Sequence, residues 1–235
     1  MPEAKGNLVS PVGYDVNGTP LTYPTTLSGR PIVVDKGLLF YEDFELGSTA
    51  WTQVCGAVAV SAVVAHMGKQ SLEITTPAVA HDYGAVSKYG FYFTGKVGLE
   101  LYFCASTHIE EVRFYYSKIL DGVSMRGYVR FVFATKKLEL TEDGGTSWET
   151  VETLTNGLFC NDTYNPFHQI RVVIDWSTQM FVSIELNGVV YDCSSYSLNV
   201  TASAVGDTPY FMVRAYTDRA AADSMWIDEV KLTEE

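Results

Sequence analysis

The sequence predicts an all-β fold, a two-sheet antiparallel jelly-roll sandwich. Of its 235 residues, 47% are hydrophobic, enough for a substantial core, and 19% are charged, which is low for a helical protein. Short segments alternate between apolar and polar residues, as half-buried strands do. Only a weak patch near 217–224 shows helical periodicity, and nothing repeats at a fixed interval. Neither a helical bundle nor a propeller is therefore expected.

The strands are expected from residue 36 onward. Ser71–Thr75 alternates cleanly, with Leu72 and Ile74 on one face. A later segment places Leu99, Leu101 and Phe103 on one face in the same way. The expected strands cover 38–44, 58–64, 71–75, 91–93, 97–104, 112–116, 128–133, 169–175, 181–186, 189–191 and 226–232. About a dozen short strands indicate two packed sheets.

The clearest hairpin joins 169–175 to 181–186 through a turn at 176–179. In its second strand, alternation predicts one shared face for Val182, Ile184 and Leu186. The dipeptide Asn187-Gly188 then suits both positive-φ positions of a type I′ turn.

Residues 1–35 differ in character and are expected to form an extended arm, separate from a sandwich domain at 36–235. They hold five of the eight prolines, which favour extended backbone. Asn17-Gly18 predicts a tight turn after Tyr14, and Ile32 and Val33 lie in a possible short strand. We expect these five residues, Tyr14, Asn17, Gly18, Ile32 and Val33, to belong to an anchoring segment.

The composition excludes several kinds of protein. The formal net charge of -12, without a stripe of lysines or arginines, argues against a nucleic-acid partner. No run of 18 apolar residues predicts a membrane span, and the first residues do not form a secretory signal. The four cysteines, Cys55, Cys104, Cys160 and Cys193, are spaced singly, which disfavours a zinc site. Two disulfides are possible by count, but free thiols are expected without an export signal.

Three segments carry a resemblance to concanavalin A-like lectin and glucanase sandwiches, which include laminin G-like modules. They are Phe40–Glu45 followed by Trp51, Gly68–Ile74, and the closing Trp226–Leu232. The hairpin from His168 to Tyr191 is similar to that of laminin G-like domains. The resemblance implies a structural Ca²⁺ held by Glu45, Asp228 and a carbonyl of Lys69, as an alternative to no cofactor. The other interpretation is an acidic pair at the end of a sheet, with water or Lys69 as its partner.

Residues 141–148 resemble the Asp-box, a hairpin motif of sialidases. Its members here are Thr141, Asp143, Gly145, Ser147 and Trp148. Asp143 can accept backbone N–H bonds across the turn, glycine permits positive φ, and Trp148 is expected to cover the corner. Because the motif occurs once and turn chemistry explains it, we expect a structural role.

Tyrosines are the candidate glycan-binding residues. The chain has 15 of them, and a ring can stack on a sugar while its hydroxyl bonds the rim. Five tyrosines lie beside polar or turn residues and are the named candidates: Tyr83, Tyr89, Tyr115, Tyr116 and Tyr164. The alternative is that tyrosines fill strand positions that suit them.

No catalytic pattern is found in the sequence. Glucanases of the resembled fold use an E-x-D-x-x-E strand, and Glu42–Glu45 has a different spacing. The four histidines are scattered, without a G-x-S-x-G nucleophile motif. We therefore expect a protein that is not an enzyme, with a glycoside hydrolase as the third alternative.

The arm also resembles segments of tailed-phage virion proteins, in 13–20 and 29–34. This likeness implies a virion surface protein, assembled in the host cytoplasm, that attaches through its arm to a major capsid or tail protein. A homo-oligomer such as a trimer and a cell-surface glycan are the further partners expected. The alternative is a lectin or carbohydrate-binding module outside any virion.

Overall fold

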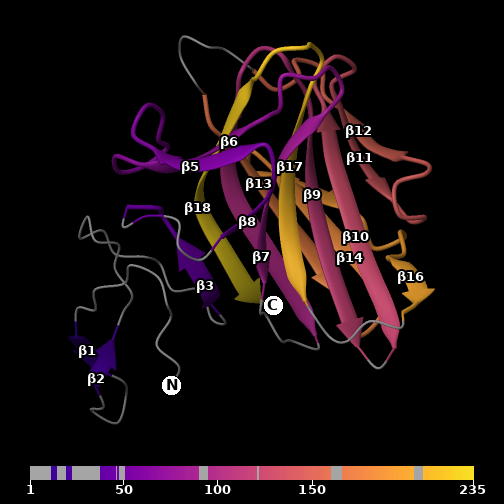
Figure 1. Ribbon diagram of the computed structural model, residues 1–235. Helices are drawn as coiled ribbons and strands as arrows, with labels where there is room; N and C mark the ends of the chain where they lie inside the picture. The colour runs from indigo at the N-terminus through magenta and orange to yellow at the C-terminus, as the bar shows by residue number, and fades with distance from the viewer. Residues whose placement is uncertain are drawn as a thin grey trace.

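Two eight-stranded antiparallel sheets pack face to face in the computed structural model (Figure 1). Structure is described for residues 38–45, 47, 51–89, 95–119, 122–159, 166–203 and 209–235, and for the backbone alone at 12–14, 20–22 and 120. None of this described part forms a helix that is long and apolar enough to cross a bilayer. The fold class predicted from the sequence is confirmed.

The front sheet has the order β12-β11-β10-β9-β17-β7-β4, with β16 beside the first half of β10. Its strands β17, β9 and β10 run side by side in front of the other sheet (Figure 1). The strand bounds are β4 Thr52–Cys55, β7 Tyr83–Tyr89, β9 Ile109–Leu120, β10 Val123–Val132, β11 Lys137–Thr141, β12 Glu149–Thr153, β16 Asn199–Ala202 and β17 Tyr210–Thr217.

The back sheet has the order β15-β14-β13-β8-β18-β6-β5. Strand β18 pairs along one edge with β6 and then with β3. The strand bounds are β3 Leu38–Glu42, β5 Ala57–Ser61, β6 Ser71–Thr75, β8 Lys96–Ala105, β13 His168–Asp175, β14 Met180–Leu186, β15 Val189–Asp192 and β18 Ser224–Glu234.

The predicted arm includes a small separate sheet. Strands β1 (Val12–Tyr14) and β2 (Pro20–Thr22) pair only with each other, and neither joins the two large sheets. The arm residues Asn17, Gly18, Ile32 and Val33 lie outside the described residues, and Tyr14 is described only as backbone.

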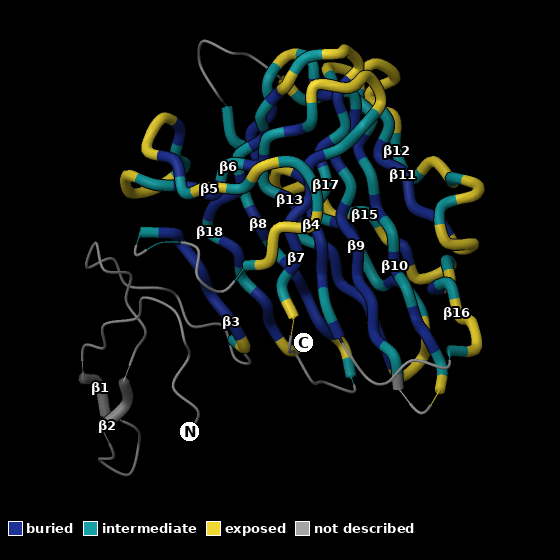
Figure 2. Tube along the Cα trace, in the orientation of Figure 1, coloured by how far each residue is buried: buried dark blue, intermediate teal, exposed yellow. Residues whose placement is uncertain are grey.

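The core lies between the two sheets. Phe103 on β8 and Phe114 on β9 meet across the interface with ring centroids 5.6 Å apart. Both side chains are fully buried, as are Leu72, Ile74 and Leu101, so the alternation predicted for these strands is correct. Figure 2 shows the same pattern, with buried positions along the central strands and exposed ones in the loops.

One expectation about local structure was wrong. Val182 does not share the buried face of Ile184 and Leu186, because a register shift between Val173 and Ile174 pairs Ile174 with Phe181 and leaves Val182 as the extra residue. The weakly periodic patch at 217–224 connects β17 to β18 through bends at 218–221, and the Thr217 hydroxyl donates a hydrogen bond to Asp223 across this turn at 2.6 Å.

The turn at 187–188 follows the prediction. Asn187 and Gly188 both have positive φ, at 51° and 81°, and they connect β14 to β15. A type I′ turn requires this pair of conformations, which asparagine and glycine tolerate. The described cysteines Cys55, Cys104 and Cys193 form no disulfide with one another, whereas Cys160 lies outside the described residues.

The contact between the two phenylalanines yields a first prediction. Phe114→Ala should lower the free energy of unfolding by about 3 to 5 kcal/mol, because it leaves a cavity between the sheets. The matched variant Phe114→Leu keeps most of the volume and should cost about 1.5 kcal/mol or less. Urea unfolding measures both values, and equal losses in the two variants would contradict this account of the core.

Candidate functional site

The outer face of the front sheet gathers arginine and tyrosine side chains. Because residues of a strand alternate between faces, the strands that bury Val86, Phe114, Val129 and Val213 turn their other residues outward. We call the outward set on four neighbouring strands the Arg–Tyr face. Its arginines and tyrosines are Tyr83, Tyr89, Arg113, Tyr115, Arg126, Tyr128, Arg130, Tyr210, Arg214 and Tyr216.

Three arginines stand in one row across this face. Arg214 on β17 pairs in register with Arg113 on β9, and Arg113 pairs with Arg130 on β10. Glu139 on β11 comes next in the row, opposite Arg130. Like charges directly opposite one another destabilise a sheet, so this row needs compensation from its surroundings.

Two buried carboxylates compensate two of the three arginines. Glu111 accepts hydrogen bonds from Arg113 and, at 3.0 Å, from Nη1 of Arg130. Glu139 accepts a bond from Nε of Arg130 at 2.7 Å. Both glutamates are only 6% exposed, which makes these ion pairs stronger than surface pairs. Arg214 is not part of this network.

Aromatic rings lie against the same arginines. The guanidinium carbon of Arg130 lies 4.0 Å from the ring centroid of Trp148, and that of Arg113 lies 4.2 Å from the ring of Tyr216. Arg214 lies 4.6 Å from the ring of Tyr83. Cation–π contacts of this kind favour a cation that is partly withdrawn from water.

Trp148 reaches Arg130 from the turn at 141–148. Asp143 holds this turn by accepting hydrogen bonds from the Thr141 hydroxyl at 2.7 Å and the Ser147 hydroxyl at 2.6 Å. Backbone N–H groups of Thr146 and Ser147 also donate to it, and Gly145 adopts a φ of 101°. These bonds, led by that of the Ser147 hydroxyl, lower the pKa of Asp143 well below its ordinary value. The turn thus places the Trp148 ring against Arg130. The sequence had predicted only that Trp148 covers the corner of the hairpin.

The tyrosines of the face form three pairs, each across two neighbouring strands. Tyr83 lies 5.1 Å from Tyr216 and Tyr89 lies 5.4 Å from Tyr210, in both cases between ring centroids. Tyr115 meets Tyr128 edge to face at 4.6 Å. The face therefore presents aromatic rings on four strands in succession.

The hydroxyl of Tyr115 lies between two arginines. Nη1 of Arg214 donates to it at 3.2 Å, and Nη1 of Arg113 lies 3.5 Å away. Nη1 of Arg214 also donates to the hydroxyl of Tyr216 at 3.4 Å. Burial, together with the neighbouring Tyr115, raises the pKa of Tyr216 to about 12, so this phenol is protonated at neutral pH.

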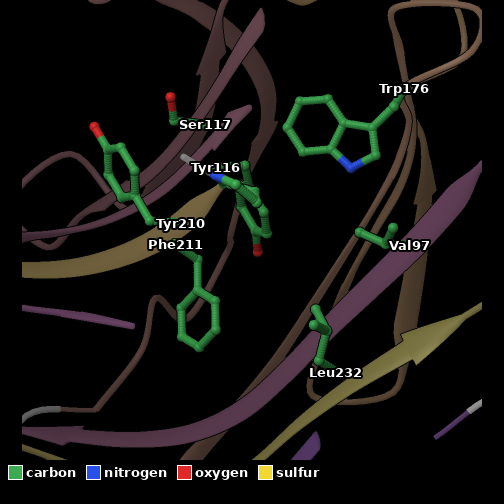
Figure 3. A pocket seen from close by; sticks show the side chains of 8 residues that line it. Val97, Tyr116, Ser117, Trp176, Tyr210, Phe211 and Leu232 are labelled. Carbon is green, nitrogen blue, oxygen red and sulfur yellow. The ribbon is translucent and has the colours of Figure 1, made fainter. Parts of the chain in front are cut away.

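Three of the five candidate tyrosines predicted from the sequence meet on this face: Tyr83, Tyr89 and Tyr115. Tyr116 was assigned wrongly, because it is 4% exposed and faces the core. Figure 3 shows its ring beside a small cavity of about 10 Å³, with Phe211 and Leu232, while Tyr210 points the other way. Tyr164 lies outside the described residues.

Sequence reasoning missed Tyr128, Tyr210 and Tyr216, and all four arginines of the face. A signal was present, since arginine and tyrosine alternate with apolar residues in 113–115, 128–130 and 210–216. That period of two places them on the face opposite the core. The pairing of the three strands, which aligns the arginines, is not visible in any one of them.

The residues proposed for Ca²⁺ do not fit a metal site. Glu45 accepts amide hydrogens from Lys69 at 2.6 Å and Gln70 at 2.9 Å. Asp228 accepts amide hydrogens from His66 at 2.9 Å, Met67 at 3.2 Å and Glu229 at 2.8 Å. Calcium needs six to eight oxygen ligands. The groups that contact these two carboxylates are instead backbone N–H groups, which donate hydrogen bonds and cannot bind a cation.

The two carboxylates instead hold the loop between β5 and β6. Gly68 has a φ of 75°, and a Cβ there would lie 2.3 Å from Glu45 Oε1, so the loop requires glycine. Among the described residues no group of three or more His, Cys, Asp or Glu could hold a metal ion. Glu45 and Asp228 each accept backbone N–H groups of this one loop.

Solved structures share the fold of this chain. An endo-β-1,4-glucuronan lyase from the fungus Trichoderma reesei has a TM-score of 0.56 and 15% identity, over 84% of this chain and 96% of that one. A Bacillus licheniformis β-glucanase has a TM-score of 0.51 and 13% identity, over 86% and 100%. A carbohydrate esterase from the Shiga toxin-encoding bacteriophage phi24B has a TM-score of 0.51 and 14% identity, over 79% and 91%. No protein family model and no curated sequence matches the chain.

These structures support the resemblance to concanavalin A-like sandwiches at the level of the fold. They also correct the expectation that the chain is not an enzyme, because the glucanase, the lyase and the phage esterase are named as enzymes. Lack of an E-x-D-x-x-E strand was too narrow a criterion for excluding catalysis. At identities of 13% to 15%, the shared fold does not establish an activity.

Buried carboxyl groups at the end of β3 and on β18 predict a stability that depends on pH. Burial raises the pKa of Glu42 from 4.5 to about 7, although its Oε1 accepts a bond from the amide of Phe44 at 3.1 Å. Burial likewise raises the pKa of Asp228 to about 7. In both cases the folded chain retains the proton longer than the unfolded chain. These groups therefore lower the free energy of unfolding as the pH rises from about 4.5 toward 7.

The variant Glu42→Gln isolates one of these groups, because it keeps the acceptor for Phe44 and cannot ionise. Relative to this variant, the wild type should lose about 1 to 2 kcal/mol of stability between about pH 5.5 and 8. Urea unfolding at both pH values tests this difference. Burial lowers the pKa of His168, so this residue raises the stability as the pH rises, opposite to Glu42. Its contribution is the same in both proteins and drops out of the difference. Parallel pH profiles for the two proteins would contradict the buried carboxyl account.

Proposed function

We propose that this chain binds carbohydrate on the Arg–Tyr face. The observation that carries the proposal is the set of three tyrosine pairs on the outer side of one sheet, spread over β7, β17, β9 and β10. Outward aromatic rings are not needed for the core, which is filled by the opposite faces of the same strands.

The chemistry of a tyrosine suits a sugar. Its ring packs against the C–H groups of a sugar ring, while its hydroxyl bonds the rim of hydroxyls. Tyr89 is 44% exposed at one end of the face and offers its ring to a sugar, whereas Tyr115 is only 8% exposed at the centre and packs against Tyr128 and Met212. The rings are held by neighbouring tyrosines and arginines, so little side-chain entropy is lost on binding. Such a surface supports recognition of an extended saccharide lying across the strands.

The similar structures are consistent with this proposal. One is named as a lyase of glucuronan, one as a β-glucanase and one as a carbohydrate esterase, so three proteins of this fold have names that refer to carbohydrate. What their names state is known for those proteins, and it reaches this chain only as support for the proposal.

We further propose that the protein acts at the surface of a phage virion. The arm at residues 1–35 would attach to a major capsid or tail protein, and the sandwich at 36–235 would display the Arg–Tyr face, with a trimer as the symmetric form. Support comes from the phage origin of one similar structure, and from the β1–β2 sheet, which is separate from the sandwich. The alternative, a lectin outside any virion, would use the same face.

Tyr128→Ala tests the carbohydrate site. It removes the ring that meets Tyr115 at 4.6 Å, so affinity for a bound glycan should fall about 10-fold, the worth of one aromatic contact. The matched control is Tyr102→Ala, on the back sheet, whose ring stacks on His66 at 4.0 Å. A glycan array identifies the ligand, and titration calorimetry measures both variants. Equal losses in the two variants, or no glycan bound by the wild type, would overturn the proposal.

Deletion of residues 1–35 tests the proposed attachment. The remaining chain should stay folded and keep its glycan affinity, because the first strand of the back sheet begins at Leu38 and that of the front sheet at Thr52. It should no longer join particles when it is produced during infection by the phage that encodes it. Incorporation is measured by quantifying the protein in purified particles, and full incorporation of the shortened chain would refute the role of the arm.

A further inference from the structure

We propose that the carbohydrate bound on the Arg–Tyr face is acidic, and that Arg214 binds its anionic group. This inference rests on the function proposed above and specifies the class of its ligand. The group can be a uronic acid carboxylate or a sulfate ester, since both offer oxygens in a geometry that an arginine can grip with two hydrogen bonds.

Arginine is concentrated on this face. Four of the seven arginines in the chain lie on this face: Arg113, Arg126, Arg130 and Arg214. The carboxylates that pair with them are Glu111 and Glu139, so the four positive charges meet only two negative ones. A local excess of positive charge in a chain of net charge -12 is a feature of this surface and not of the whole protein.

The arginines that have no carboxylate partner also lie on this face. Arg113 and Arg130 pair with glutamates on the face, and Arg171 and Arg219 pair with Glu235 and Asp223 elsewhere. Of the arginines that the structure describes, only two make no ion pair. They are Arg126 and Arg214, and both belong to the Arg–Tyr face.

Neutral groups fix the position of the Arg214 guanidinium and leave its charge without a carboxylate partner. Its Nε faces the sulfur of Met212 at 3.1 Å, and its Nη1 donates to the hydroxyls of Tyr115 and Tyr216. Within the described part of the chain, Nη2 has no hydrogen-bond partner. The rings of Tyr83 and Tyr115 lie 4.6 and 4.3 Å from the guanidinium carbon, which fixes its plane.

The placement of the two unpaired arginines also suits a chain of sugars. Arg214 belongs to the row of Arg113 and Arg130, whereas Arg126 lies opposite Ser117. The row between them contains Tyr115 and Tyr128, which pair with each other. A saccharide that crosses the sheet diagonally would meet a cation, then two rings, then a second cation.

A half-buried cation without a counter-ion costs stability, and a bound anion would offset that cost. The surrounding carboxylates, Glu111 and Glu139, are already engaged by Arg113 and Arg130 and do not reach Arg214. The net charge of -12 opposes every polyanion alike, so the choice of a saccharide over nucleic acid follows from the carbohydrate site proposed above and is tested by the DNA probe. These contacts favour an acidic saccharide.

The test compares four probes on the full chain by titration calorimetry, at about 50 and 300 mM NaCl. The probes are oligogalacturonate, heparin, a neutral cello-oligosaccharide and duplex DNA. The wild type should bind an acidic glycan more tightly than the neutral one, and more weakly in high salt. Arg214→Gln should lose about 10- to 100-fold in affinity for the acidic glycan, as expected for a charge-assisted contact.

Two further variants make the result specific. Arg171→Gln removes an arginine from the back sheet and should leave the affinity unchanged. Arg214→Lys keeps the charge without the planar fork, so it should retain part of the affinity and remains informative if Arg214→Gln is unstable. Preference for oligogalacturonate would identify a carboxylate, and preference for heparin a sulfate ester; either result supports an anionic ligand.

The probes separate a failure of the acidic ligand from a failure of carbohydrate binding. If the cello-oligosaccharide binds as tightly as the acidic probes and Arg214→Gln binds normally, this inference falls while carbohydrate binding stands. If the wild type binds no glycan, both proposals fall together. Tighter binding of duplex DNA than of either acidic glycan would overturn the choice of a saccharide.

Discussion

The structure depends on one packing constraint, the burial of two sheet faces against each other. Strand residues alternate in direction, so the inward set of each central strand is committed to the core that Phe103 and Phe114 close from opposite sheets. The outward set is released from packing. On the front sheet these outward positions hold arginine and tyrosine. The Arg–Tyr face can exist because the inward residues of the same strands fill the core by themselves.

The outer faces of the two sheets differ in how their positive charges are paired. On the back sheet, Arg171 and Lys231 each pair with a glutamate, so positive charge is matched locally. The front sheet instead places three arginines in register and supplies only two buried glutamates. Natural sheets avoid like charges directly opposite one another, because the repulsion weakens the pairing. A face that departs from this rule, and that offsets the repulsion with rings as well as carboxylates, is typical of a site kept for a ligand.

Features that looked independent in the sequence act together in space. The turn held by Asp143 was a candidate for hairpin stability alone, yet it positions Trp148 against Arg130. Glu45 and Asp228 were candidates for a metal, yet they accept amide hydrogens from one loop and fasten it to the sandwich. In both cases the chemistry of the side chain was foreseeable, whereas its partner came from a distant part of the chain.

The sequence by itself determined the fold class, the positions of most strands and the turn at Asn187 and Gly188, because these follow from local alternation and turn chemistry. It misplaced Tyr116 and Val182, where a neighbouring position or a bulge reverses the face. Only the tertiary structure decided that three arginines share a row and that Arg214 lacks an acid. The physical reason is that register between strands is set by long-range pairing, which no single segment encodes.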